Sequence, residues 1–350
     1  MKLLILADDL TGAIDTAAQI SKRCVKTLAA AEPGDLPGDC EALSVNLNMR
    51  HDSPDAAFDK VSALLRQFPD VPYTYIKTDS VLRGNLSAAF AAALAERNGR
   101  IMFVPAYPKA GRTTVGGIQY VSGIPLEKSV FAQDPLNPMK TGCVREILNM
   151  SHAVSRECVE IFDCGTQEKL EWITENLHSQ DALRLTAGCA GFAEALAGYI
   201  PFEREHASFT PDSGPALLLN GSASPVTFEQ LSHGKERGIP VVNIPLEAEA
   251  MLAAGSSVAL SSADLSILAA AAQRFVQAGY MNLAVFGGDT AFAVLRGIGC
   301  GHLRVITEIQ PGVPLSAVYR GIKLNVVTKS GGLGNVDAVT VIDRYLRTGR

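Results

Sequence analysis

The sequence lacks the patterns that mark several large classes of protein. Among its 350 residues are seven cysteines, an odd number, and no two of them have the CxxC spacing of a zinc or redox site. The longest unbroken apolar run, residues 88–95, falls far short of the ~18 residues that a membrane-spanning helix needs. The apolar run after Met1-Lys2 is short and soon meets Asp8, which argues against a signal peptide. We therefore expect a cytoplasmic protein with reduced thiols and no membrane contact.

Familiar catalytic signatures and a strong net charge are also missing. The six histidines form no HExxH motif, there is no GxSxG elbow, and neither a Walker A loop nor a GxGxxG turn follows a predicted strand. These absences argue against zinc proteases, Ser-His-Asp hydrolases, P-loop enzymes and Rossmann dehydrogenases. With 31 basic and 36 acidic residues the formal net charge is −5, which argues against a nucleic-acid partner but allows a local cationic site for a small anion.

What the sequence has is an alternation of short apolar runs and amphipathic stretches, which is typical of α/β folds. We expect strands at 3–7, 43–47, 73–77, 101–104, 216–219, 241–244, 283–286 and 324–328. We expect helices up to residue 20 and at 87–97, 224–237, 263–278, 290–298 and 336–346. Residues 106–138 are rich in Gly and Pro, show no sustained period, and are expected to form a long functional loop.

Length and composition allow two domains. Hydrophobic residues make up 47% of the 350 residues, which is enough for two sizeable cores. The sequence turns polar and loop-like at 203–215, and the α/β alternation then restarts. We predict an α/β protein of two domains, residues 1–207 and 208–350, each a mainly parallel sheet flanked by helices.

Open α/β sheets bind ligands beyond the carboxyl ends of their strands, so the residues after each strand are the candidates for a site. The first such turn holds Asp8 and Asp9, with Thr11 and Asp15 on one face of the helix that follows. An aspartate that caps the helix N-terminus and an aspartate that binds a ligand or metal both explain this pattern. The sequence leaves the choice open.

A second charged group follows the strand predicted at 73–77. Lys77 and Arg83 bracket the pair Asp79-Ser80. Cations in this arrangement can clamp a substrate carboxylate, while the carboxylate and hydroxyl between them can bind hydroxyl groups. Arg50 is a lone basic residue after another strand. The alternative interpretation of the segment from Lys77 to Arg83 is a surface loop of ion pairs.

Three glycine-rich turns in the second half link strands to helices. They are residues 220–224 (Asn-Gly-Ser-Ala-Ser), 287–290 (Gly-Gly-Asp-Thr) and 329–334 (Lys-Ser-Gly-Gly-Leu-Gly). Glycine lets backbone N–H groups approach oxygen anions, and helix N-termini favour negative charge. Three such turns in one domain predict a nucleotide phosphate site. For two small anions, a carboxylate and a triphosphate, the groups available are helix ends with Arg50, Lys77 and Lys329.

Several blocks of the sequence, taken in order, resemble the four-carbon acid sugar kinase family, whose members include D-threonate, D-erythronate and 3-oxo-tetronate kinases. The blocks are 7–16 (Ala-Asp-Asp-Leu-Thr-Gly-Ala-Ile-Asp-Thr), 77–80 with Arg83-Gly84, 105–108 with Gly111-Arg112, Asp134-Pro135, and the three glycine-rich turns with Thr227. They span nearly the whole chain.

The resemblance implies a kinase whose active site lies in the cleft between an N-terminal sugar-acid domain and a C-terminal ATP domain. Substrate contacts are implied for Asp9, Arg50, Lys77, Asp79 and Ser80, to which we add Thr78 and Arg83 of the same loop. The expected catalytic residues are Asp9, Lys77 and Asp79. Nucleotide contacts are implied for Ser222, Ser224, Gly287, Gly288, Asp289, Thr290 and Gly331, with Ser330 beside them. We expect ATP, Mg²⁺ with ligands left open, and a homodimer.

The expected reaction is transfer of the γ-phosphoryl group of ATP to the terminal hydroxyl of a four-carbon aldonic acid, with Asp9 the favoured proton acceptor. Two alternatives remain: a non-catalytic sensor of sugar acid or nucleotide on the same scaffold, and a sugar-acid aldolase or lyase that needs no ATP. Three positions differ from residues that are frequent in the family. Val81 stands in place of a hydroxyl residue, Asp289 in place of Glu, and Leu333 in place of Phe. The chain also looks short between Ser224 and Gly287.

Overall fold

The structure is a computed structural model that describes the whole chain apart from residues 135–136, 153, 156 and 206–208. The chain forms two compact units. Unit 1 comprises Met1–Arg23 with Glu32–Glu203, and unit 2 comprises Cys24–Ala31 with Arg204–Arg350. Among the described residues, none of the helices combines the length and apolar character needed to cross a bilayer.

Unit 1 is built on a parallel sheet with the strand order β3-β1-β4-β10-β5-β9. The strands are β1 (Leu3–Ala7), β3 (Ala42–Asn46), β4 (Tyr73–Lys77), β5 (Ile101–Val104), β9 (Val159–Ile161) and β10 (Leu185–Gly188). Every residue of β1 and β3 is buried, as expected for a parallel sheet covered on both faces. The strands predicted at 3–7, 73–77 and 101–104 are confirmed with these bounds.

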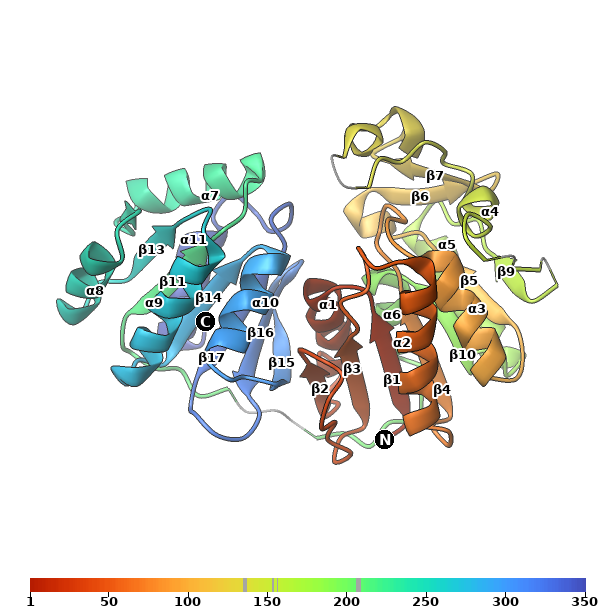
Figure 1. The fold of residues 1–350 in the computed structure, drawn as a ribbon, viewed down its shortest axis with the longest axis horizontal. Coiled ribbons are helices and arrows are strands. Elements are labelled where there is room, and N and C mark those ends of the chain that lie inside the picture. The colour runs from red at the N-terminus through yellow and green to blue at the C-terminus, as the bar shows by residue number, and fades with distance from the viewer. Residues whose placement is uncertain (135–136, 153, 156, 206–208) are drawn as a thin grey trace. The chain divides into compact units, whose positions relative to one another are not determined.

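Two groups of helices cover this sheet (Figure 1). The helices are α1 (Leu10–Ser21), α2 (Pro54–Gln67), α3 (Leu86–Glu96), α4 (Val144–Ile147), α5 (Gln167–Ser179) and α6 (Ala190–Leu196). Helix α2 packs against α3, while α1 and α5 both pack against α6. From β1 the chain runs out to β3 and then crosses back past β1 to β4. Such a reversal of strand order opens a ligand crevice beyond the carboxyl ends of the strands.

Residues 106–138 were expected to lack regular structure, and this prediction was wrong for much of the segment. It contains a small antiparallel sheet of β6 (Arg112–Val115), β7 (Ile118–Val121) and β8 (Ile124–Pro125), with 3₁₀ turns at Pro108–Ala110, Leu126–Lys128 and Val130–Gln133. Strands this short are joined by tight turns and show no period in the sequence. The β6–β7 hairpin lies beyond the carboxyl ends of the unit 1 strands (Figure 1), where Gln119 Nε2 donates to the carbonyl of Ser80 at 3.1 Å.

Unit 2 has a mixed sheet with the strand order β12-β13-β11-β14-β17-β16-β15-β2. The strands are β2 (Thr27–Ala30), β11 (Ala216–Asn220), β12 (Val241–Val242), β13 (Val258–Ser261), β14 (Asn282–Phe286), β15 (His302–Gln310), β16 (Val313–Val318) and β17 (Asn325–Lys329). The pairings from β12 to β17 are parallel, and those among β17, β16, β15 and β2 are antiparallel. The strand predicted at 241–244 has only two residues, and the β15–β16 hairpin was not predicted.

The helices of unit 2 are α7 (Pro225–Glu236), α8 (Pro245–Ala253), α9 (Leu265–Gln277), α10 (Gly288–Gly297) and α11 (Ala338–Thr348). Side chains of β11, β14, β17 and α11 form one buried core, which includes Leu218, Phe286, Val327 and Ile342. The helices expected at 224–237, 263–278, 290–298 and 336–346 are all present, with ends shifted by one to two residues.

One strand of unit 2 comes from the N-terminal part of the chain. Residues 24–31 leave unit 1, and their strand β2 pairs with β15 in an antiparallel register, Thr27 opposite Val305. The predicted division into two continuous segments does not include this exchange. The predicted boundary between residues 207 and 208 lies outside the described residues, while the change from unit 1 to unit 2 follows Glu203.

Candidate active site

Asp9 follows β1 and caps the N-terminus of α1. Its backbone is extended, its Oδ1 accepts a hydrogen bond from Gly12 N at 2.9 Å, and its Oδ2 accepts one from Thr11 Oγ1 at 3.1 Å. A Cβ on residue 12 would overlap with Asp9 Oδ1 and lie 3.0 Å from Lys77 Nζ, so only glycine leaves room here. Asp15, one turn along α1, accepts a hydrogen bond from Gln19. The capping interpretation is thus confirmed for Asp9, which has a further, charged partner as well.

The charged partner of Asp9 is Arg50, whose guanidinium is directed at three carboxylates. Its Nε lies 2.6 Å from Asp8 Oδ2, its Nη1 3.0 Å from Asp9 Oδ2, and its Nη2 3.7 Å from Asp79 Oδ1. The three carboxylates come from the loops after β1 and β4, and Arg50 comes from the loop after β3. The carboxyl ends of three neighbouring parallel strands therefore bring these side chains together, at the reversal of strand order.

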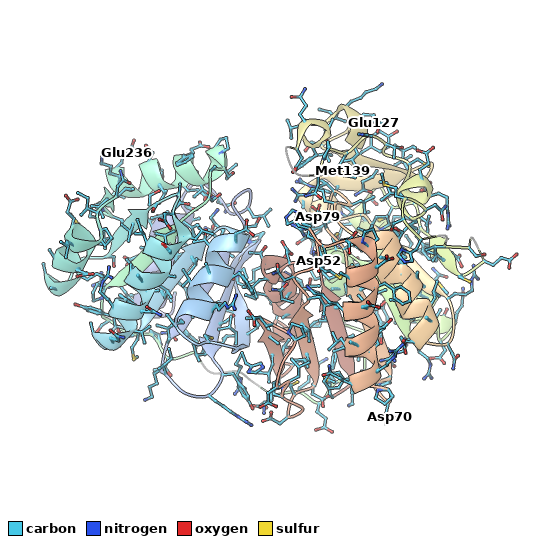
Figure 2. All side chains as sticks on the ribbon, in the orientation of Figure 1. Asp52, Asp70, Asp79, Glu127, Met139 and Glu236 are labelled. Atoms are coloured by element: carbon cyan, nitrogen blue, oxygen red, sulfur yellow. The ribbon has the colours of Figure 1, made fainter. Side chains whose placement is uncertain are left out.

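Arg83 fixes the far side of the cluster. Its Nε and Nη2 donate to the two oxygens of Asp79 at 2.8 and 3.1 Å, and its Nη1 lies 3.0 Å from Asp134 Oδ2. The backbone N–H groups of Val81 and Arg83 also donate to Asp79 Oδ2, each at 3.3 Å. Figure 2 shows Asp79 at the end of the unit 1 strands that faces β6 and β7. Of the predicted block Asp134-Pro135, Pro135 lies outside the described residues.

The three carboxyl groups differ in proton affinity because their surroundings differ. Burial raises the pKa of Asp8, although Arg50 opposes the shift. Burial acts the same way on Asp9 and Asp79, but there the cations prevail: Arg50 and Lys77 hold the pKa of Asp9 below its usual range. Arg50 and Arg83 hold the pKa of Asp79 well below it. At neutral pH the cluster thus has two firmly ionised carboxylates and one that binds a proton more readily.

Lys77 and Thr78 complete the predicted group. The Lys77 side chain is 7% exposed, its Nζ donates to the carbonyl of Thr78 at 2.8 Å, and its charge acts on Asp8, Asp9 and Asp79. The hydroxyl of Thr78 is buried and has no partner in the described part of the chain. The structure thus gathers Asp9, Arg50, Lys77, Asp79 and Arg83 in one cluster, with Thr78 and the half-buried Ser80 in the same loop.

The sequence placed Asp8 in a candidate turn and Arg112 in a family block, but assigned neither of them a role in the site. The Oδ1 atom of Asp8 is buried and unpartnered among the described residues. Arg112, on β6, interacts electrostatically with Asp79 and Arg83. Burial lowers the pKa of Arg112, although the negative charge of Asp79 opposes that shift. Its Nη1 donates to the carbonyl of Ala110 and its Nε is buried without a partner; no described carboxylate lies within 4.0 Å of it. The Gly111-Arg112 block was a signal in the sequence, but only the fold shows that this cation has no carboxylate partner among the described residues.

The three glycine-rich turns of unit 2 also meet, at the carboxyl ends of the adjacent parallel strands β11, β14 and β17. A Cβ on Gly331 would overlap with Ser222 Oγ and lie 3.1 Å from Ser224 Cβ. Gly287, with φ of 107°, is the N-cap of α10, and Thr290 Oγ1 would lie 2.9 Å from a Cβ there. Ser222 Oγ accepts a hydrogen bond from Ser224 N at 3.2 Å.

This geometry can bind phosphate. The first N–H groups of a helix lack intrahelical partners and carry partial positive charge. Helix α7 begins after Ser224, and α10 begins at Gly288, so both helix N-termini lie beside the 330–334 loop. The predicted nucleotide residues Ser222, Ser224, Gly287, Gly288, Asp289, Thr290, Ser330 and Gly331 are all in these three turns.

Lys329 differs from its expected role as a cation facing phosphate. Its side chain is 0% exposed, and its Nζ donates to the carbonyls of Ser330 and Leu333 at 3.0 and 3.1 Å. Burial lowers its pKa to about 8. The ammonium is therefore turned into the protein, because the loop that follows β17 wraps its own carbonyl groups around it.

A resident metal site is not evident in either cluster. Among the described residues, no group of three or more His, Cys, Asp or Glu side chains is arranged to hold a metal ion. Asp289, in the first turn of α10, is the one carboxylate within the three glycine-rich turns. This donor set fits Mg²⁺ that is held chiefly by phosphate oxygens and water, as is usual for nucleotide-bound Mg²⁺.

Two family models match the chain, one in each half. The family model described as sugar-binding N-terminal domain matches residues 3–159, and the one described as nucleotide-binding C-terminal domain matches residues 261–339. The first range contains the whole Asp9–Arg50–Asp79 cluster. The second contains two of the three glycine-rich turns.

Solved structures share the fold. A protein from Salmonella typhimurium, provisionally described as a tRNA synthase, has a TM-score of 0.84 at 21% identity and covers 98% of this chain and 99% of its own. At that identity the likeness shows the fold alone. A Bordetella bronchiseptica protein, described as a domain of unknown function with bound citrate and as a domain-swapped dimer, has a TM-score of 0.51 at 25% identity and covers 99% of this chain and 98% of its own.

Curated relatives match over nearly their full length. A D-threonate kinase from Cupriavidus necator is 30% identical and covers 97% of this chain and 96% of its own. A 3-oxo-tetronate kinase from the same organism is 27% identical, with 95% and 94% covered, and a D-erythronate kinase from Heliobacterium modesticaldum is 25% identical, with 99% and 97% covered. With these matches and both domain models found in order, the chain belongs to the four-carbon acid sugar kinase family.

Proposed function

We propose that this protein transfers the γ-phosphoryl group of ATP to the terminal (4-) hydroxyl of a four-carbon acid sugar such as D-threonate or D-erythronate. One observation carries the proposal: a chain of this kinase family combines a charged cluster suited to a hydroxy acid with glycine-rich turns suited to phosphate. The relatives named D-threonate, 3-oxo-tetronate and D-erythronate kinase support the reaction and define the acids to be tested.

The acid would bind at the cluster of unit 1. Arg50 already directs its Nε, Nη1 and Nη2 at carboxylates of the protein, so it is a poor choice for the substrate carboxylate. Arg112 has no described carboxylate partner and a buried Nε without an acceptor. A guanidinium in this state gains the most from a bidentate pair with a carboxylate. We therefore assign the substrate carboxylate to Arg112, with Lys77 beside it, and the hydroxyl groups to Asp9, Asp79 and the Thr78–Ser80 loop.

Asp9 is the residue we assign to proton transfer. Because Arg50 and Lys77 keep its pKa low, Asp9 is ionised at neutral pH and can accept a hydrogen bond from the attacking hydroxyl. As the new O–P bond forms and the bond from the γ-phosphorus to the bridging oxygen breaks, the hydroxyl proton moves to Asp9. Phosphoryl transfer depends mainly on positioning and charge neutralisation, so a weak base at the right place is sufficient.

The triphosphate of ATP would lie against the N-termini of α7 and α10 and the amide groups of the 330–334 loop. The hydroxyls of Ser222, Ser224 and Thr290 line the same turns and can donate to phosphate oxygens. Mg²⁺ bound to the phosphates would neutralise part of their charge, with Asp289 the carboxylate available to orient its waters. The two sites must meet for transfer, either within one chain or across a dimer.

A homodimer is part of the proposal, with the domain-swapped dimer of the Bordetella relative as its support. The mass of the protein in solution, measured by light scattering after size-exclusion chromatography, tests it. A mass of 37.1 kDa at all concentrations would contradict the dimer.

The reaction is tested by incubating the protein with ATP, Mg²⁺ and each of a panel of four-carbon acids while ADP and the phosphate ester are measured. We expect ADP and a 4-phosphate ester in equal amounts with at least one acid. Asp9→Asn and Lys77→Ala should lose most of the turnover, and Lys323→Met, an exposed lysine, should retain it. Near-normal rates in both site variants would contradict the assigned roles.

The same experiment separates the two alternatives. A protein that binds an acid or ADP but forms no ADP with any acid is a sensor on the kinase scaffold. Consumption of an acid in the absence of nucleotide identifies an aldolase or lyase. The buried, paired cations of unit 1 fit a kinase, a sensor and an aldolase or lyase alike. The converging glycine-rich turns have a use only where a nucleotide binds.

A further inference from the structure

Lys329 is a fully buried lysine with no acidic partner. It ends β17, its side chain is 0% exposed, and no carboxylate of the described residues lies within 4.0 Å of its Nζ. Lysines at this depth are almost always paired with an acidic side chain. An ammonium that is buried without an acidic partner needs another source of negative potential.

The source is a ring of oxygen atoms. The Nζ atom donates to the carbonyls of Ser330 at 3.0 Å and Leu333 at 3.1 Å, with Gly331 O at 3.5 Å and the hydroxyl of Thr227 at 3.3 Å. The face of Phe286 lies on another side, 5.3 Å from Nζ to the ring centroid. Neutral oxygens and an aromatic face are the surroundings of a monovalent cation bound inside a protein.

Two side chains of α7 extend the same arrangement along the loop. Thr227 Oγ1 donates to the carbonyl of Gly331 at 2.8 Å. Gln230 Nε2 lies 3.1, 3.0 and 2.9 Å from the carbonyl oxygens of Leu333, Gly334 and Asn335. Between them, Lys329, Thr227 and Gln230 contact five carbonyl groups of the 330–335 loop.

The direction of the carbonyls fixes the direction of the amides. In a trans peptide the C=O and N–H bonds point to opposite sides. The carbonyls of Ser330 and Gly331 point towards Lys329 and Thr227, so the N–H groups of Gly331 and Gly332 point away from them. A Cβ on Gly331 would meet Ser222 and Ser224, so the loop lies against the turn that leads into α7.

We propose that Lys329 is a positioning residue for the nucleotide phosphates: an internal cation that gathers the carbonyls of the 330–335 loop and so presents the Gly331 and Gly332 amides to the phosphate. The inference rests on the proposed function, because the phosphate belongs to ATP. It differs from the expected role of Lys329, since the ammonium stabilises the loop and does not touch the nucleotide.

The test compares Lys329→Met, which keeps the length of the side chain and removes its charge, with Lys323→Met as the matched control on the exposed loop before β17. ADP is the probe, and its Kd is measured by calorimetry. We expect a rise of about tenfold or more for Lys329→Met, faster hydrogen exchange at Gly331 and Gly332, and no change in the KM of the acid. Lys323→Met should bind ADP as the natural protein does.

Chemical rescue gives a readout that a packing defect alone would not. Lys329→Ala leaves an oxygen-lined space, and millimolar ethylammonium should restore part of the ADP affinity, whereas the uncharged isostere propane should not. A folded Lys329→Met variant with the natural Kd for ADP overturns the proposal. Where neither Lys329 variant folds, Gln230→Leu decides: it retains the buried charge, and unchanged ADP affinity in it contradicts the carbonyl-gathering role.

Failure of this inference is distinguishable from failure of the proposed function. If the natural protein binds neither ADP nor ATP, the kinase proposal itself falls. If the natural protein binds ADP and Lys329→Met binds it equally well, only the role of Lys329 falls.

Discussion

Arg83 holds Asp79 by two parallel hydrogen bonds, Nε to Oδ2 at 2.8 Å and Nη2 to Oδ1 at 3.1 Å. A bidentate pair of this kind fixes the plane of the carboxylate as well as its position. The remaining Nη1 of Arg83 reaches Asp134, so the loop after β4 is joined to the segment that carries the β6–β8 sheet. The orientation of the Asp79 carboxylate therefore depends on a guanidinium, whose bidentate geometry a lysine cannot reproduce.

Arg83→Lys should lower kcat/KM for the acid with the overall fold intact. The loss of one charge-assisted hydrogen bond is worth ~1.5–3 kcal/mol, or roughly a ten- to hundredfold change. The KM of ATP should not change. Arg184→Lys is the matched control, since Arg184 pairs with Asp181 on an exposed turn. Equal kcat/KM values for Arg83→Lys and the natural protein would show that the bidentate geometry is dispensable.

Arg50→Gln should destabilise unit 1 strongly. The substitution leaves Asp8, Asp9 and Asp79 without the guanidinium that contacts all three of them. Removal of one member of a buried charge cluster costs ~3–5 kcal/mol. Urea unfolding followed by circular dichroism measures the effect. The exposed Arg66, paired with Glu96, provides the comparison, and Arg66→Gln should have a much smaller effect.

The pH dependence of stability should have opposite signs at Asp79 and Asp8. The folded pKa of Asp79 is lowered, so its contribution is present above the unfolded value near 3.8 and is lost as pH falls through the folded value. The folded pKa of Asp8 is raised, so its contribution is present at low pH and is lost as pH rises through the folded value.

Unfolding free energies measured between pH 3 and 7 test this difference. Asp79→Asn should flatten the acid limb of the stability profile, whereas Asp8→Asn should steepen it. Both variants retain Arg50, which provides an internal control for the cluster. The same slope in both variants would mean that the two carboxyl groups share one environment, contrary to their contacts.

Arg112→Gln should raise the KM of the acid by roughly ten- to hundredfold, the value of ~1.5–3 kcal/mol for a hydrogen bond to a charged group. Arg112→Lys should restore part of the loss because it retains the charge. The polyol that lacks the carboxylate serves as a control ligand: its weak binding should be the same in all three proteins. A KM for the acid that is unaffected by Arg112→Gln would assign the substrate carboxylate elsewhere.

Gly331→Ala should weaken ADP binding by about tenfold, equivalent to ~1.4 kcal/mol, because the new Cβ would collide with the hydroxyl of Ser222 and displace the loop. Gly301→Ala is a suitable control, since a Cβ at Gly301 meets nothing within 4 Å. Calorimetry with ADP gives both values. Unchanged ADP affinity in Gly331→Ala would remove the loop from the nucleotide site.

The central strands of both units could be read from the sequence because strands buried on two faces are continuous apolar runs, as in β1 and β11. Strand β2 could not, since its partner β15 lies far along the chain and its four residues carry no local signal. The β6–β8 sheet was not predicted for a related reason, because its strands are too short to establish a hydrophobic period in the sequence.

The site shows the same division. Residues that follow predicted strands, such as Asp9 and Asp79, were found because parallel strands end at one edge of a sheet. What the sequence could not supply was which cations are already engaged. Arg50 is engaged by three carboxylates and Lys329 by backbone carbonyls, whereas Arg112 has no described carboxylate partner and a buried Nε without an acceptor; only the contacts distinguish them.

The exchange of β2 sets a condition on how the chain is made. At a synthesis rate of ~5–20 residues per second, residues 27–30 leave the ribosome roughly a quarter of a minute or more before β15 exists to pair with them. During that interval the four-residue segment lacks its β15 partner, and parts of unit 1 lie on both sides of it in the chain. A gene fragment that begins after Glu203 would have the opposite defect, an unpaired β15 edge that is open to association with other chains. Unit 2 is thus complete only when a strand from the N-terminal part of the chain joins it.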